Sequence, residues 1–479
     1  MTNAPIQNVA PGTFRAETHW YPKALNATIH PMVSFFLNLD RERIISRYCH
    51  LNPLVDADGL REMLTYRCKH FLWGGADLIN ATTAQGRRRM VIIENNSCPS
   101  GQKSMPLTDD HQEEGGYRVL VERTFKPLVG KRSSQKDGRL AVIYDKNPME
   151  ASGYAAAIAD AFQEDVLYIC DYHNAPERHL KTEDGWLYAR YEGEWVRLRA
   201  AFRYLTQRPW TRLPINCKTR ILNPIVTCLA GGRNKMVAAK AYDLFNGEIR
   251  KYGLKIHTPE TIWDVSRNEI PLWIAKLGGQ AVVKVPYSNA GQGVFTITNP
   301  AELQAFMDTP IEYERFIVQS LIGNYRWSST GGDGKFFHVG TIPDKKGRTY
   351  VSDVRLMVSS TESGIRPICC YSRRAEAPLA DDLDESAESW KMLGTNLSEK
   401  LGDNQWGSDT NRLLLMDRRD FNKLGIALDD LIEAYIQTVL STIAIDHMAQ
   451  KLFNSKGKFS RRLFGSLNDD PALLSEIPA

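Results

Sequence analysis

Two oxygen-bearing side chains lie where an apolar segment ends. Glu94 and Asn96 follow the run 90–93 and directly precede the turn residues 97–101. Residues two apart on a strand point to the same face, so these two side chains project together. A carboxylate beside an amide oxygen suits a hard divalent cation such as Mg²⁺. The pattern therefore predicts a metal site at a strand end.

A companion strand precedes this one. Residues 74–79 read as a strand and 86–89 as the connecting turn, so the hairpin would bring Asp77 towards the same ion. An Asp strand, a turn, and Glu-x-Asn before a Ser/Pro/Gly turn resembles the metal-binding end of ATP-grasp ligases. In most of that superfamily this piece closes the chain. Here it comes first, so the order resembles a circular permutation.

A lysine occupies the middle of another apolar strand. Lys284 lies in the run 281–286, and the small residues of a loop follow it, including Ser288, Gly291 and Gly293. A buried ammonium is costly unless it meets a negative partner, and phosphate is one. Glycine tolerates the dihedrals that let backbone amides approach phosphate. The alternative is a surface hairpin in which Lys284 reaches water.

Other segments in the same order extend the resemblance. Lys235 opens a helix, where phosphate is favoured, and the resemblance implies that it and Lys284 are the two phosphate-binding lysines. It also implies an adenine-binding hinge, in which the base contact at Ser320 is through the backbone because many members carry an acidic residue there. The hinge residues are Gln319, Ser320, Leu321 and Ile322.

Two further segments resemble those that contact phosphate and substrate in this family. The Asp-x-Arg strand implies that Arg355 meets phosphate. Segments around Arg374 and Asn396 resemble those of ATP-grasp enzymes that add glutamate to protein tails, so Arg374 would bind an acyl phosphate or substrate carboxylate and Asn396 would assist. Taken singly, each has a structural alternative: a cross-strand ion pair of Asp353 with Arg355, a solvated turn, or a helix cap.

Composition limits the other possibilities. The net charge of +4 over 479 residues argues against a dedicated nucleic-acid binder. No stretch approaches the ~20 apolar residues of a membrane span, and the N-terminus lacks the features of a signal peptide. Eight cysteines without CxxC spacing indicate reduced thiols and a cytoplasmic protein.

The chain is long enough for several subdomains. We expect an α+β protein: an ATP-grasp fold in circularly permuted order plus a small α/β pre-ATP-grasp domain. Residues 60–73 and 428–453 read as helices, the second a possible dimer helix, 140–170 as a βαβ unit, and 186–195 as a hairpin. The expected divisions are an N-terminal segment with the metal-binding end (1–106), a connector (107–138), the α/β domain (139–222), the nucleotide-binding subdomains (223–460) and a poorly ordered tail (461–479).

The resemblance implies an ATP- and Mg²⁺-dependent ligase that joins a small carboxylate to an amine, an amino acid or peptide, through an acyl phosphate. Glutathionylspermidine synthetase-like proteins and peptide ligases of natural-product pathways share the permuted order. A kinase and a non-catalytic nucleotide-binding regulator are the alternatives. Cys98 receives no chemical role. Four aromatic residues fit either an acceptor pocket or a packed hairpin: Trp186, Tyr188, Tyr191 and Trp195.

Overall fold

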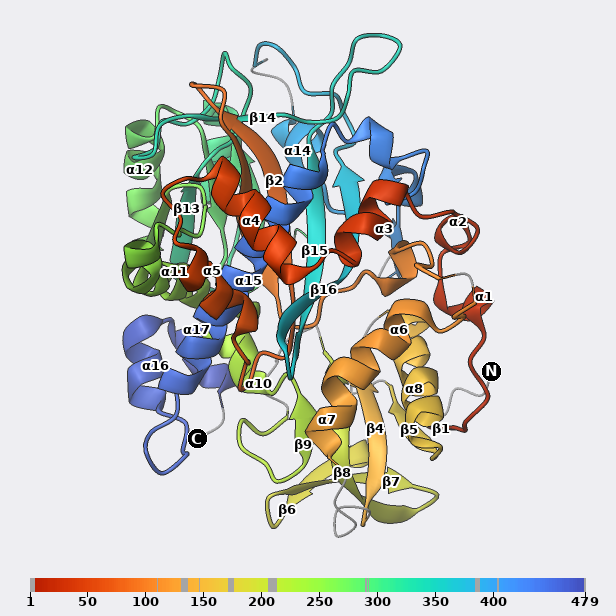
Figure 1. Ribbon diagram of the computed structural model, residues 1–479. Coiled ribbons are helices and arrows are strands. Elements are labelled where there is room, and N and C mark those ends of the chain that lie inside the picture. The colour runs from red at the N-terminus through yellow and green to blue at the C-terminus, as the bar shows by residue number, and fades with distance from the viewer. Residues whose placement is uncertain are drawn as a thin grey trace.

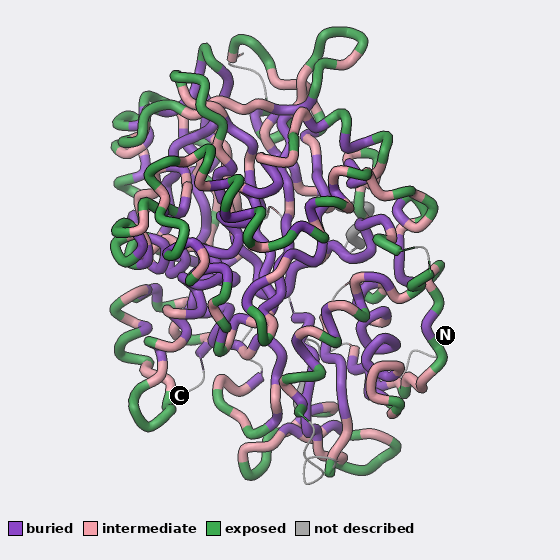
Figure 2. Tube along the Cα trace, viewed as in Figure 1, coloured by how far each residue is buried: buried purple, intermediate pink, exposed green. Residues whose placement is uncertain are grey.

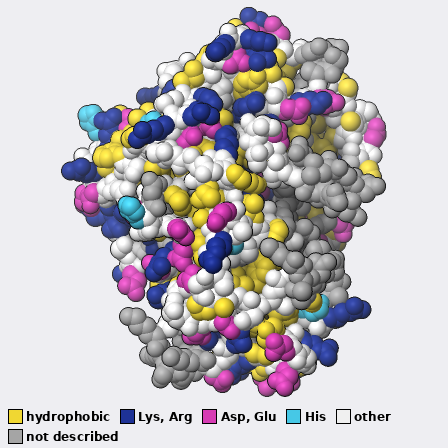
Figure 3. Space-filling view, turned by 90° about the vertical axis from the view of Figure 1, so that its right-hand side faces the viewer, with side chains coloured by type: hydrophobic (Ala, Val, Ile, Leu, Met, Phe, Trp, Pro, Cys, Tyr) yellow, Lys and Arg dark blue, Asp and Glu magenta, His cyan; other side chains and the backbone are white. Residues whose placement is uncertain are grey.

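The computed structural model describes residues 5–109, 111–130, 137–145, 147–170, 176–205, 213–288, 291, 293–383, 388–402 and 405–477. Its sheets form two regions, an upper body and a lower α/β domain (Figure 1). Within the described ranges, no helix has the length and apolar character needed to cross a membrane. On the face in Figure 3, acidic and basic side chains are interspersed.

The lower domain is a mixed sheet. The strands β4 (Arg139–Tyr144) and β5 (Val166–Ile169) are parallel and joined by α8 (Pro148–Phe162), which confirms the expected βαβ unit. The sheet order is β1 (Ile6–Val9), β5, β4, β8 (Glu194–Tyr204), β7 (Trp186–Tyr191) and β6 (Leu180–Glu183), with β9 (Arg220–Leu222) beside β8. Residues 6–9 therefore lie in this sheet, far from the hairpin that follows them in sequence.

A four-stranded antiparallel sheet forms one wall of the upper body. Its order is β10 (Thr261–Ser266), β13 (Arg315–Ser320), β11 (Ala281–Lys284) and β12 (Val294–Ile297). Pro286 follows β11 closely and cannot donate a ladder hydrogen bond. The adjoining helices are α11 (Lys235–Ile249), α12 (Ile270–Lys276) and α13 (Pro300–Asp308).

The second wall is a six-stranded sheet that brings distant segments together. The predicted hairpin is present as β2 (Trp73–Thr83) and β3 (Arg88–Asn96), and β2 pairs antiparallel with β15 (Ser352–Thr361). The remaining strands are β14 (Phe336–His338) beside β2, then β16 (Gly364–Arg374) and β19 (Leu413–Leu414) beyond β15. The N-terminal hairpin is thus an integral part of a sheet built mostly from residues after 335.

The long helix α15 (Leu428–Lys451) runs through the upper body and is buried along most of its length (Figure 2). It packs against β2, β3, β15 and α11. Its Asp446 carboxylate accepts hydrogen bonds from the backbone amides of Lys69, His70 and Phe71. The expected helix is confirmed, but its faces are used inside the subunit, so its assignment as a dimer helix is wrong.

Three other expectations are corrected. The helix expected over 60–73 is α5 (Ala57–Thr65), because residues 66–72 lead as extended chain into β2. The stretch 115–129 of the connector is helical, with Tyr117 and Phe125 fully buried. The tail forms α16 (Arg461–Leu467) and α17 (Pro471–Glu476), because Asp470 caps α17 and accepts backbone hydrogen bonds from β13 and its approach. Residues 131–136, 478 and 479 lie outside the described ranges.

The remaining elements are short. They are α1 (Ala16–His19), α2 (Pro22–Leu25), α3 (Pro31–Leu37), α4 (Arg41–Leu51), α6 (Gly115–Leu120), the π-helix Val121–Phe125, α7 (Lys126–Val129), α9 (Pro176–His179), α10 (Ile225–Thr227), α14 (Ser389–Leu393), β17 (Ser398–Gly402) and β18 (Gln405–Ser408).

Candidate active site

A large cavity of about 1280 Å³ lies between the two antiparallel sheets. The four-stranded sheet contributes Val282, Lys284 and Gln319 to its lining, and the six-stranded sheet contributes Asp77, Glu94 and Arg355, among others. Residues of the α/β domain close another part of it. The volume exceeds that of an ordinary small-molecule site, so the cavity has room for more than one ligand.

Asp77, Glu94 and Asn96 all line this cavity, as the sequence pattern predicted. In the β2–β3 ladder, Asp77 stands opposite Glu94 and Asn96 opposite Gly75, which places the three side chains on one face. A bulge at residue 93 precedes Glu94. The intervening Asn95 turns to the other face, where its amide donates to Ser441 of α15 at 2.7 Å. Strand alternation therefore turns Glu94 and Asn96 towards the cavity and Asn95 towards helix α15.

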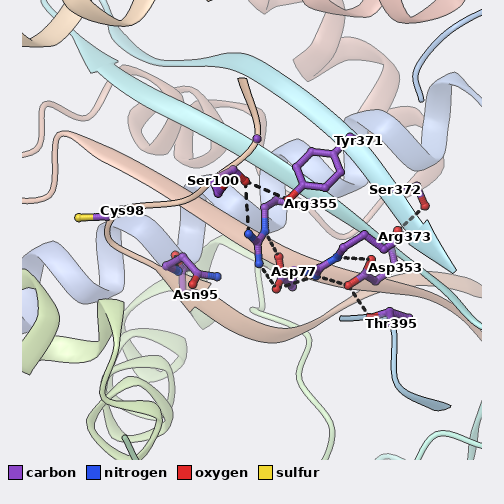
Figure 4. Close-up of polar contacts among 12 residues, drawn as sticks. Asp77, Asn95, Cys98, Ser100, Asp353, Arg355, Tyr371, Ser372, Arg373 and Thr395 are labelled. Carbon is purple, nitrogen blue, oxygen red and sulfur yellow. Dashed lines mark hydrogen bonds and ion pairs between the residues drawn. The ribbon is translucent and has the colours of Figure 1, made fainter. Parts of the chain in front are cut away.

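The Asp77 carboxylate is held by two guanidinium groups (Figure 4). Arg355 donates to both of its oxygens, at 2.5 and 2.6 Å, and Arg373 lies 2.9 Å from Oδ2. Arg373 also pairs with Asp353, which accepts a further hydrogen bond from Thr395. Asp77 is buried, yet attraction to Arg355 and Arg373 outweighs desolvation and lowers its pKa well below the usual range.

These residues fit a hard metal ion in part. Among the described residues, no three His, Cys, Asp or Glu side chains gather as a metal site. The set here relies on one amide, Asn96, whose Nδ2 is buried with no hydrogen-bond partner. Asp77, Glu94 and Asn96 offer only hard oxygen ligands to one cavity, which suits Mg²⁺. Asp77 would share its oxygens between the ion and the arginines, and its role as a ligand stays a prediction.

The two predicted phosphate-binding lysines both contact β3. Lys284 donates to the carbonyl oxygen of Ile93 at 2.9 Å, the residue at the bulge. Burial lowers its pKa to about 8, although nearby Glu94 opposes the shift. Lys235 pairs with Glu94 at 3.2 Å and donates to Ser288 at 3.1 Å. Lys235 lines a smaller adjacent cavity, whereas Lys284 lines both that cavity and the main one.

The predicted hinge also lines the main cavity, with all four of its residues from Gln319 to Ile322. The backbone of Leu321 already makes hydrogen bonds within the protein. Its amide donates to Ser329 Oγ and its carbonyl accepts from the Ser329 amide. Gln319 donates to Thr261. His338, absent from the sequence prediction, joins this part of the cavity, and burial lowers its pKa to about 4. Its imidazole is therefore neutral near pH 7.

The glycine loop lies against the 389–398 segment at Gly291. Gly291 and Gly293 have φ of 77° and 71°, which favours glycine. A Cβ at Gly291 would meet Trp390 at 3.0 Å and Asn396 at 3.3 Å. Asn396 lines the cavity as predicted. Asn289, Ala290 and Gln292 of the loop lie outside the described residues.

Arg373 rather than Arg374 reaches the cavity. Arg373 stands opposite Asp353 and Tyr371 opposite Arg355, all on the cavity face. Arg374 points away, donates to the carbonyl of Ala375 and lies over the ring of Tyr350 at 4.6 Å. Tyr371 pairs with Arg355, and every second residue of a strand faces the same side. Counting two residues on from Tyr371 would therefore have identified Arg373. Lys103 and Arg233 also line the cavity and were not among the site residues predicted from the sequence.

The remaining candidates have structural roles. Cys98 lines the cavity but is buried, donates to the carbonyl of Arg203 and has a raised pKa from burial. The 186–195 aromatics form the predicted hairpin, where Trp186 lies against Arg197 and Trp195 against Lys181. None of its four aromatic side chains is among the described residues that line the main cavity.

Comparison with known proteins gives structural neighbours only. No family model and no curated protein matches the sequence. One similar structure is an ATP-grasp RimK domain protein from Sphaerobacter thermophilus DSM 20745 (16% identity, 48% of this chain and 90% of the other, TM-score 0.30). A glutathione synthetase-like effector from Globodera pallida matches at 10% identity over 73% and 85% of the two chains (TM-score 0.37). The ATP-grasp ligase PsnB matches at 14% over 63% and 99% (TM-score 0.26). The fold is α+β, as predicted. Two of these three structural neighbours are named as ATP-grasp proteins.

Proposed function

We propose that this protein is an ATP-dependent carboxylate–amine ligase of the ATP-grasp type. The observation that supports it most is the cavity between two antiparallel sheets, where oxygen side chains, fixed cations and the 319–322 segment share one space. A nucleotide extending from 319–322 towards Glu94 would place its phosphates beside Lys284 and Arg355. This arrangement matches the needs of phosphoryl transfer, which depends on positioning and charge.

In this proposal Asp77, Glu94 and Asn96 hold Mg²⁺, which would supply positive charge to the phosphate oxygens. Lys284 and Arg355 add fixed positive charge on the same side. Lys235 keeps Glu94 in place through its ion pair. Because these groups are buried and pre-positioned, they stabilise developing negative charge with little reorganisation.

The reaction then has two steps. An oxygen of the substrate carboxylate attacks the γ-phosphorus and ADP leaves, which gives an acyl phosphate. The amine attacks the acyl carbon, phosphate leaves, and the amine loses a proton to give the amide. Arg373 binds Asp353 and Asp77 through Nε and Nη2, and its Nη1 would bind the carboxylate or acyl phosphate. Gly291, packed beside Trp390 and Asn396, would help to keep water from the intermediate.

We also propose the circularly permuted order and the domain boundaries given above, with 6–9 assigned to the α/β domain and 461–477 as a helical segment. The β2–β3 hairpin supports the permutation, because it joins a sheet whose other strands begin 240 or more positions after the hairpin ends. Placement in the cytoplasm and a homodimer remain predictions.

The deciding experiment is a phosphate-release screen with Mg-ATP against pooled amino acids and short peptides, read with mass spectrometry. A product equal to two substrates minus water, formed with ADP and phosphate, supports the ligase. A phosphorylated product without condensation would identify a kinase instead. ATP binding by calorimetry without turnover in any pool would favour the regulatory alternative.

A further inference from the structure

A second group of cationic side chains lines the main cavity beside the α/β domain. Lys103 and Arg233 are only 7% and 5% exposed, yet both face this space. Among the described residues, Lys103 contacts Asn147 at 3.3 Å and the ring of Tyr21 at 5.0 Å, and has no carboxylate partner. A buried ammonium without a counter-charge is unfavourable. The site therefore calls for an anion.

The backbone around Lys103 is rigidly held. The fully buried Glu150 accepts hydrogen bonds from Ser100 Oγ at 2.6 Å and from the amides of Gly101 and Gln102 at 2.8 Å each. Tyr204 donates to the same carboxylate at 3.0 Å. These contacts tie the 100–104 segment, which follows the metal-site strand directly, to helix α8.

The start of α8 borders the same part of the cavity. The helix has 15 residues, and no side chain caps its N-terminus. Asn147, with φ of 55°, turns its Oδ1 to Lys103. Pro148 and Met149 of the first turn line the cavity. The buried Glu150 of the first turn already meets part of the positive end of this helix, so the cationic character of the cavity lining here comes from Lys103 and Arg233.

The acidic side chains that line the cavity belong to other parts of it. Asp77 and Asp353 are bonded to arginines, and Glu94 pairs with Lys235. Glu312 lies on the segment that precedes β13. Among the described lining residues beside α8, Lys103 and Arg233 are therefore the charged ones, while Glu150 does not line the cavity and is held by four hydrogen bonds.

We propose that Lys103, with Arg233 and the start of α8, binds a carboxylate of the substrate that does not react. This inference rests on the proposed ligase function and names its substrate class: the amine is donated by an amino acid or peptide with a free carboxylate. The reacting carboxylate lies at Arg373, and the second carboxylate orients the amine towards it.

A binding experiment tests this site without requiring turnover. Saturation-transfer NMR compares a pool of dipeptides with the same pool amidated at the C-terminus, with Mg²⁺ and a non-hydrolysable ATP analogue. We expect the wild-type protein to bind free acids about ten-fold more tightly than their amides. Equal binding of the two pools by the wild-type protein would overturn the site.

Variants test whether Lys103 causes the preference for free acids over amides. K103M should remove this preference, and K103R should retain most of it because the positive charge is kept. K276M is the matched control, since Lys276 is exposed and also lies over an aromatic ring, Trp273, at 4.7 Å. It should behave as the wild type. A preference that survives in folded K103M would refute the assignment.

The two proposals fail in different ways. Preference for free acids without any condensation refutes the ligase but keeps the carboxylate site. Condensation that proceeds equally well with amidated amines keeps the ligase and refutes the site.

Discussion

The carboxylate of Asp77 and the guanidinium of Arg355 face each other across neighbouring strands and share two hydrogen bonds of 2.5 and 2.6 Å. Because Arg373 also reaches Asp77, one carboxylate holds two cations at the edge of the cavity. This arrangement fixes the positions of both arginines, and the carboxylates of Asp77 and Asp353 balance their charge.

Replacing Asp77 tests that arrangement. In D77N, Arg355 loses its charged partner while buried, so we expect the free energy of unfolding to fall by about 3–5 kcal/mol. Urea denaturation measures the change. D344N is a matched control, because Asp344 makes a similar arginine pair with Arg348 on the surface. An equal loss in both variants would contradict the role of burial.

Glu94 is the clearest test of the metal site. E94Q keeps the shape but removes the charge, and we expect Mg²⁺-dependent ATP turnover to fall about 100-fold. Mn²⁺ affinity measured by electron paramagnetic resonance, with an ATP analogue bound, should fall as well. E362Q, at an exposed turn, should match the wild type. Unchanged metal affinity in E94Q would remove Glu94 from the site.

Neighbouring arginines on β16 offer a matched pair. R373K keeps the charge but loses the planar fork that meets Asp77 and Asp353, so kcat should fall about 100-fold. R374K changes a side chain that lies over Tyr350 away from the cavity, and kcat should stay within about two-fold. Steady-state kinetics of both variants measures the change in kcat. A larger loss of kcat in R374K than in R373K would support the sequence prediction that Arg374 binds substrate.

Lys284 should make nucleotide binding depend on pH. Its pKa of about 8 means that the free protein loses this positive charge above that pH. ATP affinity measured by calorimetry should therefore weaken from pH 7 to 9, beyond any change in K284R, whose guanidinium stays charged. A flat profile for the wild type would show that Lys284 does not meet phosphate.

The lowered pKa of Lys284 also makes the free energy of unfolding depend on pH. Between pH 8 and about 10.4, the unfolded chain keeps the Lys284 proton that the folded protein has lost. The free energy of unfolding contributed by this residue therefore rises with pH across that window. Chemical denaturation of the wild type and K284M, compared at pH 7.5 and 10, should show the wild type gaining relative to the variant.

Glu150 should control the 100–104 segment. E150Q replaces a carboxylate that accepts four hydrogen bonds with an amide that has one accepting oxygen, so we expect a loss of about 3 kcal/mol in unfolding free energy. Hydrogen exchange of the amides of Gly101 and Gln102 should also become faster. Unchanged protection there would show that other contacts hold the segment.

Local pattern determined much of this protein. The alternation in 88–96 predicts that Glu94 and Asn96 share a face, and the structure places both on the cavity with Asp77. The apolar run with Lys284 and the βαβ unit were equally readable, because strand period and helix spacing depend on neighbouring residues alone.

Tertiary structure decided the rest. Whether Arg373 or Arg374 enters the cavity depends on which face of β16 meets the other sheet, and one residue of register reverses the answer. Asp77 meets Arg355 only because strands 278 positions apart become neighbours. Lys103 lines the cavity in a segment that Glu150 of α8 holds in place, and this contact is not visible in the sequence. Long-range pairing creates these relationships, and no local pattern in the sequence encodes them.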